Sequence, residues 1–168
     1  SSKTRIKLLM RLFLNPEASA YLRGLAQEFN ESTNSVRIEL NRFEEAGMLH
    51  SDKEGNKKVF KANTNYPLFE DIRNILLKYT GLQEIIDTVI DKVGNVEEVY
   101  LTGELAEGIY SNDISLVIIG YPDLAYVQEL AQKAQKVIQK NIAYTVYSPK
   151  EAPVLLLNAK HSLLLWHE

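Results

Sequence analysis

The segment from Asn30 to Ala62 constrains the fold more than any other part of the chain. Ser32 is a residue type whose hydroxyl accepts a hydrogen bond from a free backbone N–H in a first helical turn. Val36, Leu40 and Phe43 then recur with the spacing of one helical face. The segment therefore opens with a capped amphipathic helix.

This helix is followed by signals for a stop and a hairpin. Gly47 stands where a left-handed residue commonly ends a helix. The stretches 48–53 and 57–62 have the composition of two short strands, joined through Glu54, Gly55 and Asn56. We expect a helix, a tight stop and an antiparallel hairpin in direct succession.

If Val36, Leu40 and Phe43 pack inward, polar side chains remain on the outer face of the helix. Short hydroxyl, amide and guanidinium groups suit base edges and phosphates in a DNA major groove. The hairpin adds an amide and ammonium groups, which suit phosphates. The candidate DNA-binding residues are Thr33, Asn34, Ser35, Arg37, Asn41, Arg42, Asn56, Lys57 and Lys58.

Two further helices are predicted before this segment. One apolar stripe consists of Ile6, Leu9, Met10 and Phe13 and ends at Asn15-Pro16. A second consists of Leu22, Leu25, Ala26 and Phe29 and is expected to begin near Ser19. Two helices joined by a short turn, with polar residues outward on the second, are typical of a helix-turn-helix.

The stretches 21–26 (YLRGLA) and 35–49 (SVRIELNRFEEAGML) resemble bacterial winged-helix transcriptional regulators. The resemblance implies a winged helix-turn-helix domain over residues 1–66, with double-stranded DNA as its partner. It also implies a regulator of bacterial or archaeal type that acts as a homodimer. In such a dimer the recognition helices meet successive major grooves, about 34 Å apart, on a nearly palindromic site.

Composition and charge are compatible with this interpretation. The 168 residues include no cysteine, so disulfides and thiolate metal sites are excluded and a cytoplasmic location is expected. No apolar run has the length of a membrane span. The net charge of −3 is unevenly distributed, with +3 over residues 1–80 and −6 over residues 81–168, which favours different partners for the two halves.

The second half begins with a connecting helix, predicted over 67–80. It has Phe69, Ile72, Leu76 and Tyr79 on one face and Leu68 and Ile75 beside that face. This apolar surface exceeds what one small domain needs, so the helix is also a candidate for dimerisation. Helix and strand patterns then alternate through residues 81–168. The chain is therefore expected to be α+β, a winged helix followed by a small α/β domain.

Residues 99–108 and 111–118 resemble the core of minimal nucleotidyltransferases of the polymerase-beta-like superfamily. In that family a Gly-Ser turn binds triphosphate and two carboxylates on one strand face hold magnesium. Gly103 and Asp113 match this pattern, but Glu104 replaces the serine and Ser115 replaces the second carboxylate. We expect Glu104 to oppose phosphate at a helix N-terminus.

These departures predict a degenerate nucleotidyltransferase domain that serves as a scaffold or sensor. It would have no catalytic residue, no metal and no cofactor, so the chain would not be an enzyme. Two alternatives remain at this point. One is an active, magnesium-dependent enzyme that transfers a nucleoside monophosphate, and the other is a winged helix that binds a protein in place of DNA.

Overall fold

The structure is a computed structural model that describes residues 1–152 and 162–168. The chain divides into two compact units, which we call the N-terminal unit (Ser1–Leu76) and the C-terminal unit (Leu77–Glu168). The division falls inside the predicted connecting helix. A short helix that the sequence predicts from Pro149 to Asn158 lies mostly outside the described residues.

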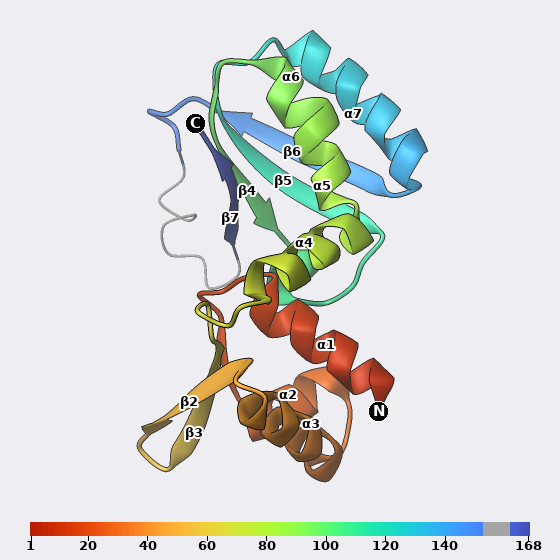
Figure 1. The fold of residues 1–168 in the computed structure, drawn as a ribbon. Coiled ribbons are helices and arrows are strands. Elements are labelled where there is room, and N and C mark those ends of the chain that lie inside the picture. Colours follow the sequence, from red (N-terminus) through yellow and green to blue (C-terminus); the bar gives the residue numbers. More distant parts are fainter. Residues whose placement is uncertain (153–161) are drawn as a thin grey trace. The chain divides into compact units, whose positions relative to one another are not determined.

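The N-terminal unit combines three helices with a three-stranded antiparallel sheet, in the strand order β1-β3-β2 (Figure 1). Its elements are α1 (Ser2–Phe13), β1 (Ser19–Tyr21), α2 (Leu22–Phe29), α3 (Thr33–Glu45), β2 (Leu49–Glu54) and β3 (Lys57–Ala62).

The local signals around α3 are confirmed. The Ser32 hydroxyl accepts from the Ser35 backbone N–H at 3.1 Å, which caps the helix. Gly47 has a φ of +79°, as expected for the residue that ends it. The hairpin follows, and β2 and β3 pair in register from Leu49–Ala62 to Glu54–Lys57.

Two predictions for the first thirty residues are wrong. The second helix does not begin near Ser19, because residues 19–21 form β1 and pair with Val59–Lys61 of β3. Ile6 does not join the core, since its side chain is 46% exposed. The buried face of α1 instead includes Leu8 and Leu12.

The core of the N-terminal unit contains residues of α1, α2 and α3 and of the first turn of the helix that begins at Phe69. Leu8, Leu25 and Val36 are fully buried, one from each helix. Phe13 packs against Phe69, with ring centroids 5.5 Å apart. Burial of Val36 and Leu40 fixes the rotation of α3, so its polar face is turned to solvent.

The next helix, α4 (Phe69–Thr80), contains the division between the units. The C-terminal unit continues as a mixed α+β domain with a four-stranded sheet. Its further elements are α5 (Leu82–Ile85), a π-helical turn η1 (Ile86–Ile90), α6 (Asp91–Val93), β4 (Val96–Thr102), a 3-10 turn η2 (Glu104–Glu107), β5 (Asp113–Gly120), α7 (Leu124–Ile138), β6 (Asn141–Tyr147) and β7 (Leu163–His167).

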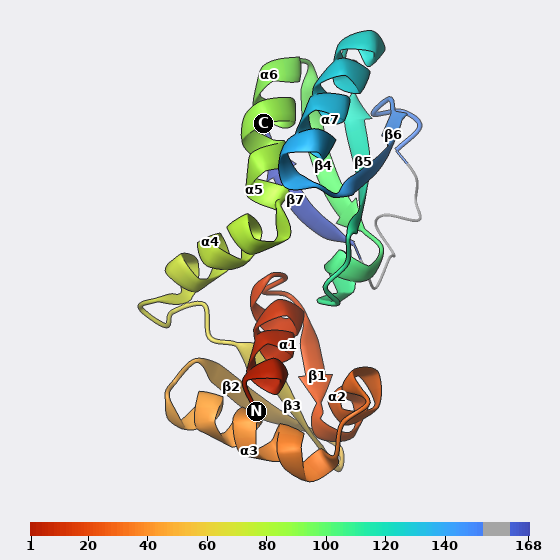
Figure 2. The same cartoon turned by 90° about the vertical axis from the view of Figure 1, so that its right-hand side faces the viewer.

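The sheet has the order β6-β5-β4-β7, and only β5 and β6 run parallel. The parallel pair is connected through α7, as such pairs require. Figures 1 and 2 show α5, α6 and α7 together on one face of this sheet. The core of this unit contains Leu101, Leu116 and Ile118 of the sheet and Leu82 and Val127 of the helices, all of which are buried.

The sequence predicts strands over 96–102, 114–119, 142–147 and 163–166, and the structure agrees with these to within a residue or two. The sequence also predicts one continuous helix from Leu82 to Val93, but the π-helical turn at 86–90 divides it. Val137, which the helical pattern places in the core, is 66% exposed near the end of α7. None of the described helices is long and apolar enough to cross a membrane.

Gly120 allows a test of the C-terminal unit. Its φ is +149°, and a Cβ there would lie 2.4 Å from the Asn95 carbonyl oxygen. Gly120→Ala should lower the free energy of unfolding of this unit by at least about 2 kcal/mol, because backbone atoms must move. Urea denaturation followed by circular dichroism measures this loss.

Gly94→Ala is the matched control. Gly94 has a φ of +70°, but no heavy atom lies within 4 Å of the position that a Cβ would take. It should cost only the backbone strain, about 1–3 kcal/mol, because its φ of 70° and ψ of 163° suit glycine alone, whereas Gly120→Ala should lose more because of the added close contact. Equal losses for the two variants would contradict the close approach at Gly120.

Candidate nucleic-acid interface and nucleotidyltransferase-like motif

All nine candidate DNA-binding residues are exposed. They lie on two neighbouring parts of the N-terminal unit, the outward face of α3 and the hairpin of β2 and β3. The α3 residues are Thr33, Asn34, Ser35, Arg37, Asn41 and Arg42, and the hairpin residues are Asn56, Lys57 and Lys58.

Three of these residues share one groove. Arg37 and Asn41 from α3 and Lys58 from β3 line a space of about 160 Å³, together with Leu22, Leu40 and Phe60. Lys58 reaches α3 because residues two apart on a strand lie on the same face, and Lys58 shares its face of β3 with the buried Phe60. We call Arg37, Asn41 and Lys58 the groove triad.

Lys58 is electrostatically paired inside the N-terminal unit. Its ammonium donates to a carboxylate oxygen of Glu44 at 2.8 Å. The hydroxyl of Ser51 donates to the other oxygen of Glu44. The bond from Lys58, followed by that from Ser51, holds the pKa of Glu44 below its ordinary value. The positive charge of Lys58 is therefore partly balanced, by a contact that the sequence did not indicate.

Lys57 lies on the other face of β3. Its ammonium stands over the ring of Tyr21, 4.1 Å from the centroid. Tyr21 pairs with Val59, which shares that face of the strand with Lys57. The hairpin therefore presents lysines on both faces, and of Lys57 and Lys58 it is Lys58 that lines the groove with Arg37.

A buried carboxylate lies on the inner face of α3, and it was not predicted from the sequence. Glu39 is only 2% exposed, and Arg5 of α1 donates to it at 2.8 Å. The bond from Arg5 lowers the pKa of Glu39, although burial acts in the opposite direction. Arg42 also contacts Glu39, at 3.4 Å. Arg42 is thus held by α3 itself.

Ile38 is a second residue that was not predicted to belong to this surface. It is 44% exposed on α3, one residue from Arg37 and one helical turn from Asn34 and Asn41. An exposed apolar residue among such polar groups is suited to contact with a thymine methyl group. Ile38 was not predicted because only polar side chains of α3 were considered as candidates for this surface.

The nucleotidyltransferase-like motif lies in the hairpin of β4 and β5. Gly103 ends β4 with a φ of +75°, a backbone conformation that glycine adopts readily. Glu104 then begins a single 3-10 turn of four residues. One such turn has little dipole, so the predicted clash of Glu104 with a phosphate site at a helix N-terminus is wrong.

Asp113 and Ser115 lie on the face of β5 that α5–α7 do not cover, since they alternate with buried Ile114 and Leu116. The hydroxyls of Ser115 and Thr102 are 3.0 Å apart and hydrogen-bonded. The carboxylate of Asp113 accepts from the Asn141 side chain at 2.7 Å. Asp113 and Ser115 are thus on the same face, as predicted.

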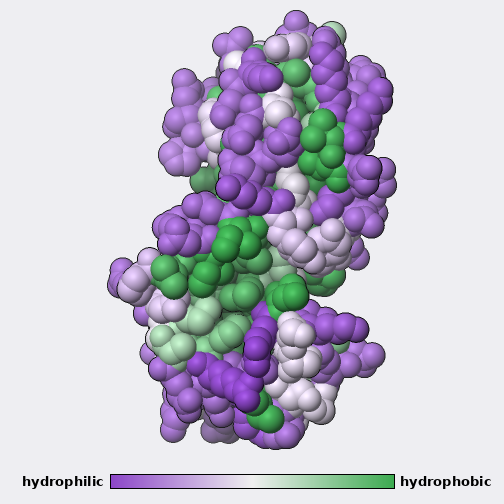
Figure 3. Space-filling view, turned by 45° about the vertical axis from the view of Figure 1, so that its right-hand side comes forward, coloured by the Kyte–Doolittle hydropathy of each residue, from purple (hydrophilic) through white to green (hydrophobic). Residues whose placement is uncertain are grey.

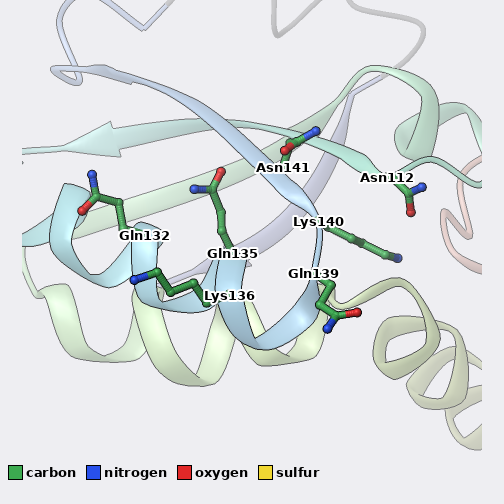
Figure 4. Close-up of a pocket in the computed structure, with 7 residues that line it drawn as sticks. All are labelled: Asn112, Gln132, Gln135, Lys136, Gln139, Lys140 and Asn141. Carbon is green, nitrogen blue, oxygen red and sulfur yellow. The ribbon is translucent and has the colours of Figure 1, made fainter.

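Asn141 also borders a polar pocket of about 640 Å³ at the end of α7 (Figure 4). The lining consists of amides and two lysines, with no carboxylate: Asn112, Gln132, Gln135, Lys136, Gln139, Lys140 and Asn141. The Lys140 ammonium donates to the Thr80 carbonyl at 2.7 Å and lies over the Tyr110 ring. Lys136 is the exposed cation of this lining.

Metal ligands are sparse in the part of the chain that the structure describes. Residues 1–152 and 162–168 contain no group of three or more His, Asp or Glu side chains placed to hold a metal ion. Asp113 contributes one carboxylate, whereas magnesium in nucleotidyl transfer is held by two or more. The described residues therefore do not fit a two-metal site.

The sequence matches no protein-family model and no curated protein. Solved structures with partial similarity include a tri-AMPylated Shewanella oneidensis HEPN toxin in complex with MNT antitoxin, at 19% identity and a TM-score of 0.38, over 54% of this chain and 72% of that chain. Another, from Sulfolobus solfataricus, is described as a "putative nucleotidyltransferase", with 20% identity, a TM-score of 0.36 and coverage of 54% and 86%.

A third similar structure is described as a "possible transcriptional regulator for arsenical resistance", with 19% identity, a TM-score of 0.32 and coverage of 54% and 85%. The prediction that the chain is not an enzyme is corrected here, because it relied on a helix N-terminus at Glu104, where the structure has one 3-10 turn.

Glu39 provides a pH-dependent test of how α3 is held. A carboxyl whose pKa is lowered on folding adds stability above its unfolded pKa, here near 4.5, and the contribution is lost as the pH falls through the lowered value. Glu39→Gln should therefore destabilise the N-terminal unit by about 1–3 kcal/mol at pH 7. The difference from the parent chain should shrink below pH 4.5.

Denaturation midpoints measured from pH 7 to pH 3 follow this difference. Glu45→Gln is the control, because Glu45 is an exposed acid on the same helix. A Glu39→Gln penalty that does not change with pH would show that the Arg5 contact contributes nothing through the carboxylate charge.

Proposed function

We propose that the N-terminal unit is a winged helix that binds double-stranded DNA, and that the chain acts as a transcriptional regulator. In this proposal α3 is the recognition helix and the β2–β3 hairpin is the wing. The observation that carries the proposal is the groove triad, which brings a guanidinium, an amide and an ammonium from two elements onto one exposed surface.

The outward face of α3 has the chemistry of base recognition. Arginine pairs with guanine through two hydrogen bonds, and asparagine pairs with adenine in the same way. Arg37, Asn34 and Asn41 supply these groups, and Ile38 adds an apolar contact between them. We assign these four residues to base edges.

The remaining candidates suit the DNA backbone. Thr33 and Ser35 stand in the first turn of α3, where free backbone N–H groups also favour phosphate. Asn56 and Lys57 lie at the exposed end of the hairpin. One guanidinium nitrogen of Arg42 is held by Glu39, so we assign Arg42 a weaker role.

A protein partner is the competing interpretation of the same surface. Protein interfaces are enriched in aromatic residues and poor in lysine. The outward residues of α3 include no aromatic side chain, and Tyr21, an exposed ring on β1, is covered in part by Lys57. This composition favours DNA.

The experiment is a selection from random duplexes with the purified chain, followed by binding measurements on the selected sequence. Arg37→Ala should weaken the free energy of binding to the selected sequence by about 1–3 kcal/mol, because it removes a contact with one base pair. Binding to unrelated duplexes should weaken much less. Fluorescence anisotropy at fixed salt measures both affinities.

Lys57→Ala is the informative comparison and Lys133→Ala, an exposed lysine of α7, is the control. Lys57→Ala should weaken binding to all DNA sequences by the same factor. It should also lower the slope of log K against log salt concentration by about 1. If Arg37→Ala lowers the affinity for every DNA sequence equally, base recognition by Arg37 is excluded. Failure to enrich any duplex at low salt would overturn the proposal in favour of a protein partner.

A second candidate function is nucleotide binding and transfer by the C-terminal unit. The observation in its favour is that Asp113 is hydrogen-bonded to Asn141, which lines the pocket beside Lys136. An ammonium and several amides suit phosphate oxygens. Because the described residues do not fit a two-metal site, we derive no catalytic step.

Calorimetric titration with ATP and magnesium tests this candidate. Binding is expected, and Lys136→Ala should weaken it because the variant removes the exposed cation of the pocket, whereas Lys133→Ala should not. Incubation with ATP labelled at the α-phosphate then shows whether label is transferred to protein or nucleic acid. No binding heat at millimolar ATP would eliminate this candidate function.

A further inference from the structure

Strand β6 lies at one edge of the four-stranded sheet in the C-terminal unit. It pairs with β5 in an unbroken parallel register of seven residues, from Asp113–Asn141 to Ile119–Tyr147. In the described part of the chain no strand lies on its other side, and Figure 1 shows β6 as an outer strand of the sheet. One long edge of β6 is therefore without a neighbouring strand among residues 1–152 and 162–168.

The backbone groups of β6 alternate between its two edges. The Asn141 N–H donates to the Asn112 carbonyl at 2.8 Å, so the backbone of Asn141 is directed to the side of β5. By alternation, the backbone groups of Ile142, Tyr144 and Val146 are directed to the outer edge. Within the described residues, the N–H groups of Tyr144 and Val146 have no hydrogen-bond partner. The outer edge thus offers backbone hydrogen-bonding groups to an approaching strand.

The Ile142 N–H, which is also directed outward, is bound by a side chain in place of a strand. It donates to the side-chain oxygen of Gln135 of α7 at 2.8 Å. Figure 4 shows Gln132 and Gln135 extending from α7 on the side of β6. A side-chain amide has the same kinds of donor and acceptor as a peptide backbone. The surroundings of this edge are therefore suited to a peptide.

β6 lacks the features that usually protect the edge of a sheet, which are charged side chains, proline and bulges. Its sequence has no charged residue and no proline, and its pairing with β5 has no register shift: Asn141–Tyr147 reads NIAYTVY. The outer strand β7, in contrast, has five residues and a register shift in its pairing with β4. Figure 3 shows largely hydrophilic side chains over α6 and α7, so charge lies on these helices and not on β6.

The pocket at the start of β6 indicates the charge of a suitable strand. This pocket of about 640 Å³ is bordered by Asn141, and its lining includes Lys136 and no carboxylate. Lys136 is exposed, and β6 supplies no negative charge to balance it. A carboxylate is the side-chain group that an exposed ammonium and several amides bind well. Charge complementarity therefore favours a strand with an acidic residue at this end.

We propose that the outer edge of β6 binds an extended peptide segment of a partner protein, which adds a strand to the sheet and carries an acidic side chain beside Lys136. Backbone hydrogen bonds to Tyr144 and Val146 supply affinity in this mode of recognition, and side chains supply specificity. The inference is independent of DNA binding, because it concerns residues of the C-terminal unit. It differs from nucleotide binding in its use of Val146, which is not in the lining of the pocket.

A selection with the full chain from a library of random short peptides tests the proposal. The selected peptides should share a run of β-branched residues with an acidic residue at one end. The affinity of one such peptide, synthesised with a fluorescent label, is then measured by fluorescence anisotropy. This peptide is the probe for the experiments that follow.

Methylation of the peptide backbone shows whether the probe binds as a strand. In a strand added to β6, alternate N–H groups face β6 and the others face away. N-methylation of one alternate set should lower the affinity about a hundredfold, because it removes several hydrogen bonds and obstructs the approach. N-methylation of the other set should change the affinity little. These two peptides leave the protein unaltered.

Val146→Pro tests the edge from the side of the protein. Proline removes the outward N–H but no hydrogen bond to β5, and it is tolerated at the edges of sheets. This variant should lower the affinity for the probe about tenfold. Val146→Thr is the matched control, since it keeps the N–H and the branched side chain and should bind the probe like the parent chain. Circular dichroism confirms that both variants are folded.

The acidic end of the probe is tested at Lys136. Lys136→Glu should lower the affinity about tenfold, because it replaces an attraction by a repulsion. Lys133→Glu changes an exposed lysine of the same helix that is outside the pocket lining, and should have no effect. An unchanged affinity in Lys136→Glu would overturn the assignment of an acidic residue to this end.

Three outcomes would overturn strand addition at β6. The first is a library from which no peptide is enriched. The second is a probe that tolerates N-methylation of either alternate set equally. The third is a probe that binds Val146→Pro as tightly as the parent chain. A parent chain that sediments as a dimer, which Val146→Pro dissociates and which excludes the probe, would instead assign this edge to a second copy.

Discussion

The packing of α3 against α1 and α2 is the interaction on which the proposed function depends. Val36 and Leu40 are buried to 1% exposure or less, and this burial determines which residues of α3 face solvent. The ion pair between Glu39 and Arg5 adds a directional contact in the same interface. A rotation of α3 by one residue would bury polar groups without partners, so the outward face is strongly specified.

The hairpin extends this surface through strand alternation. Lys58 faces α3 because it shares the face of Phe60, and Lys57 faces away because it shares the face of Val59. The balance between Lys58 and Glu44 has a functional consequence. A phosphate that approached the groove triad would compete with Glu44 for Lys58, so this lysine is expected to add less to affinity than an unpaired one.

Much of this architecture was predictable because its signals are local. Ser32, Gly47 and Gly55 specify a cap, a stop and a turn through their own backbone chemistry, and α3 and the hairpin agree with the sequence to within a residue or two. β1 was not predictable in this way. Its three residues become a strand only by pairing with β3, which is distant in the sequence.

The same distinction applies to the candidate site. Exposure of the nine predicted residues follows from helical and strand periodicity, which a sequence contains. Arg5 is 34 residues from Glu39 and Glu44 is 14 residues from Lys58, and only the folded chain brings these pairs together. For the C-terminal unit, the prediction about activity depended on the identities of the motif residues, and these identities say little about the geometry around them, such as the 3-10 turn at Glu104.

The most direct measurement is a titration of the ¹⁵N-labelled chain with the selected DNA duplex, followed by nuclear magnetic resonance. The mass of 19.1 kDa is within reach of amide spectra. The amides of α3 and of the β2–β3 hairpin should change most, and the side-chain signals of Asn34, Arg37 and Asn41 should change with them. Changes confined to the C-terminal unit, or none at low salt, would contradict DNA binding by α3 and the hairpin.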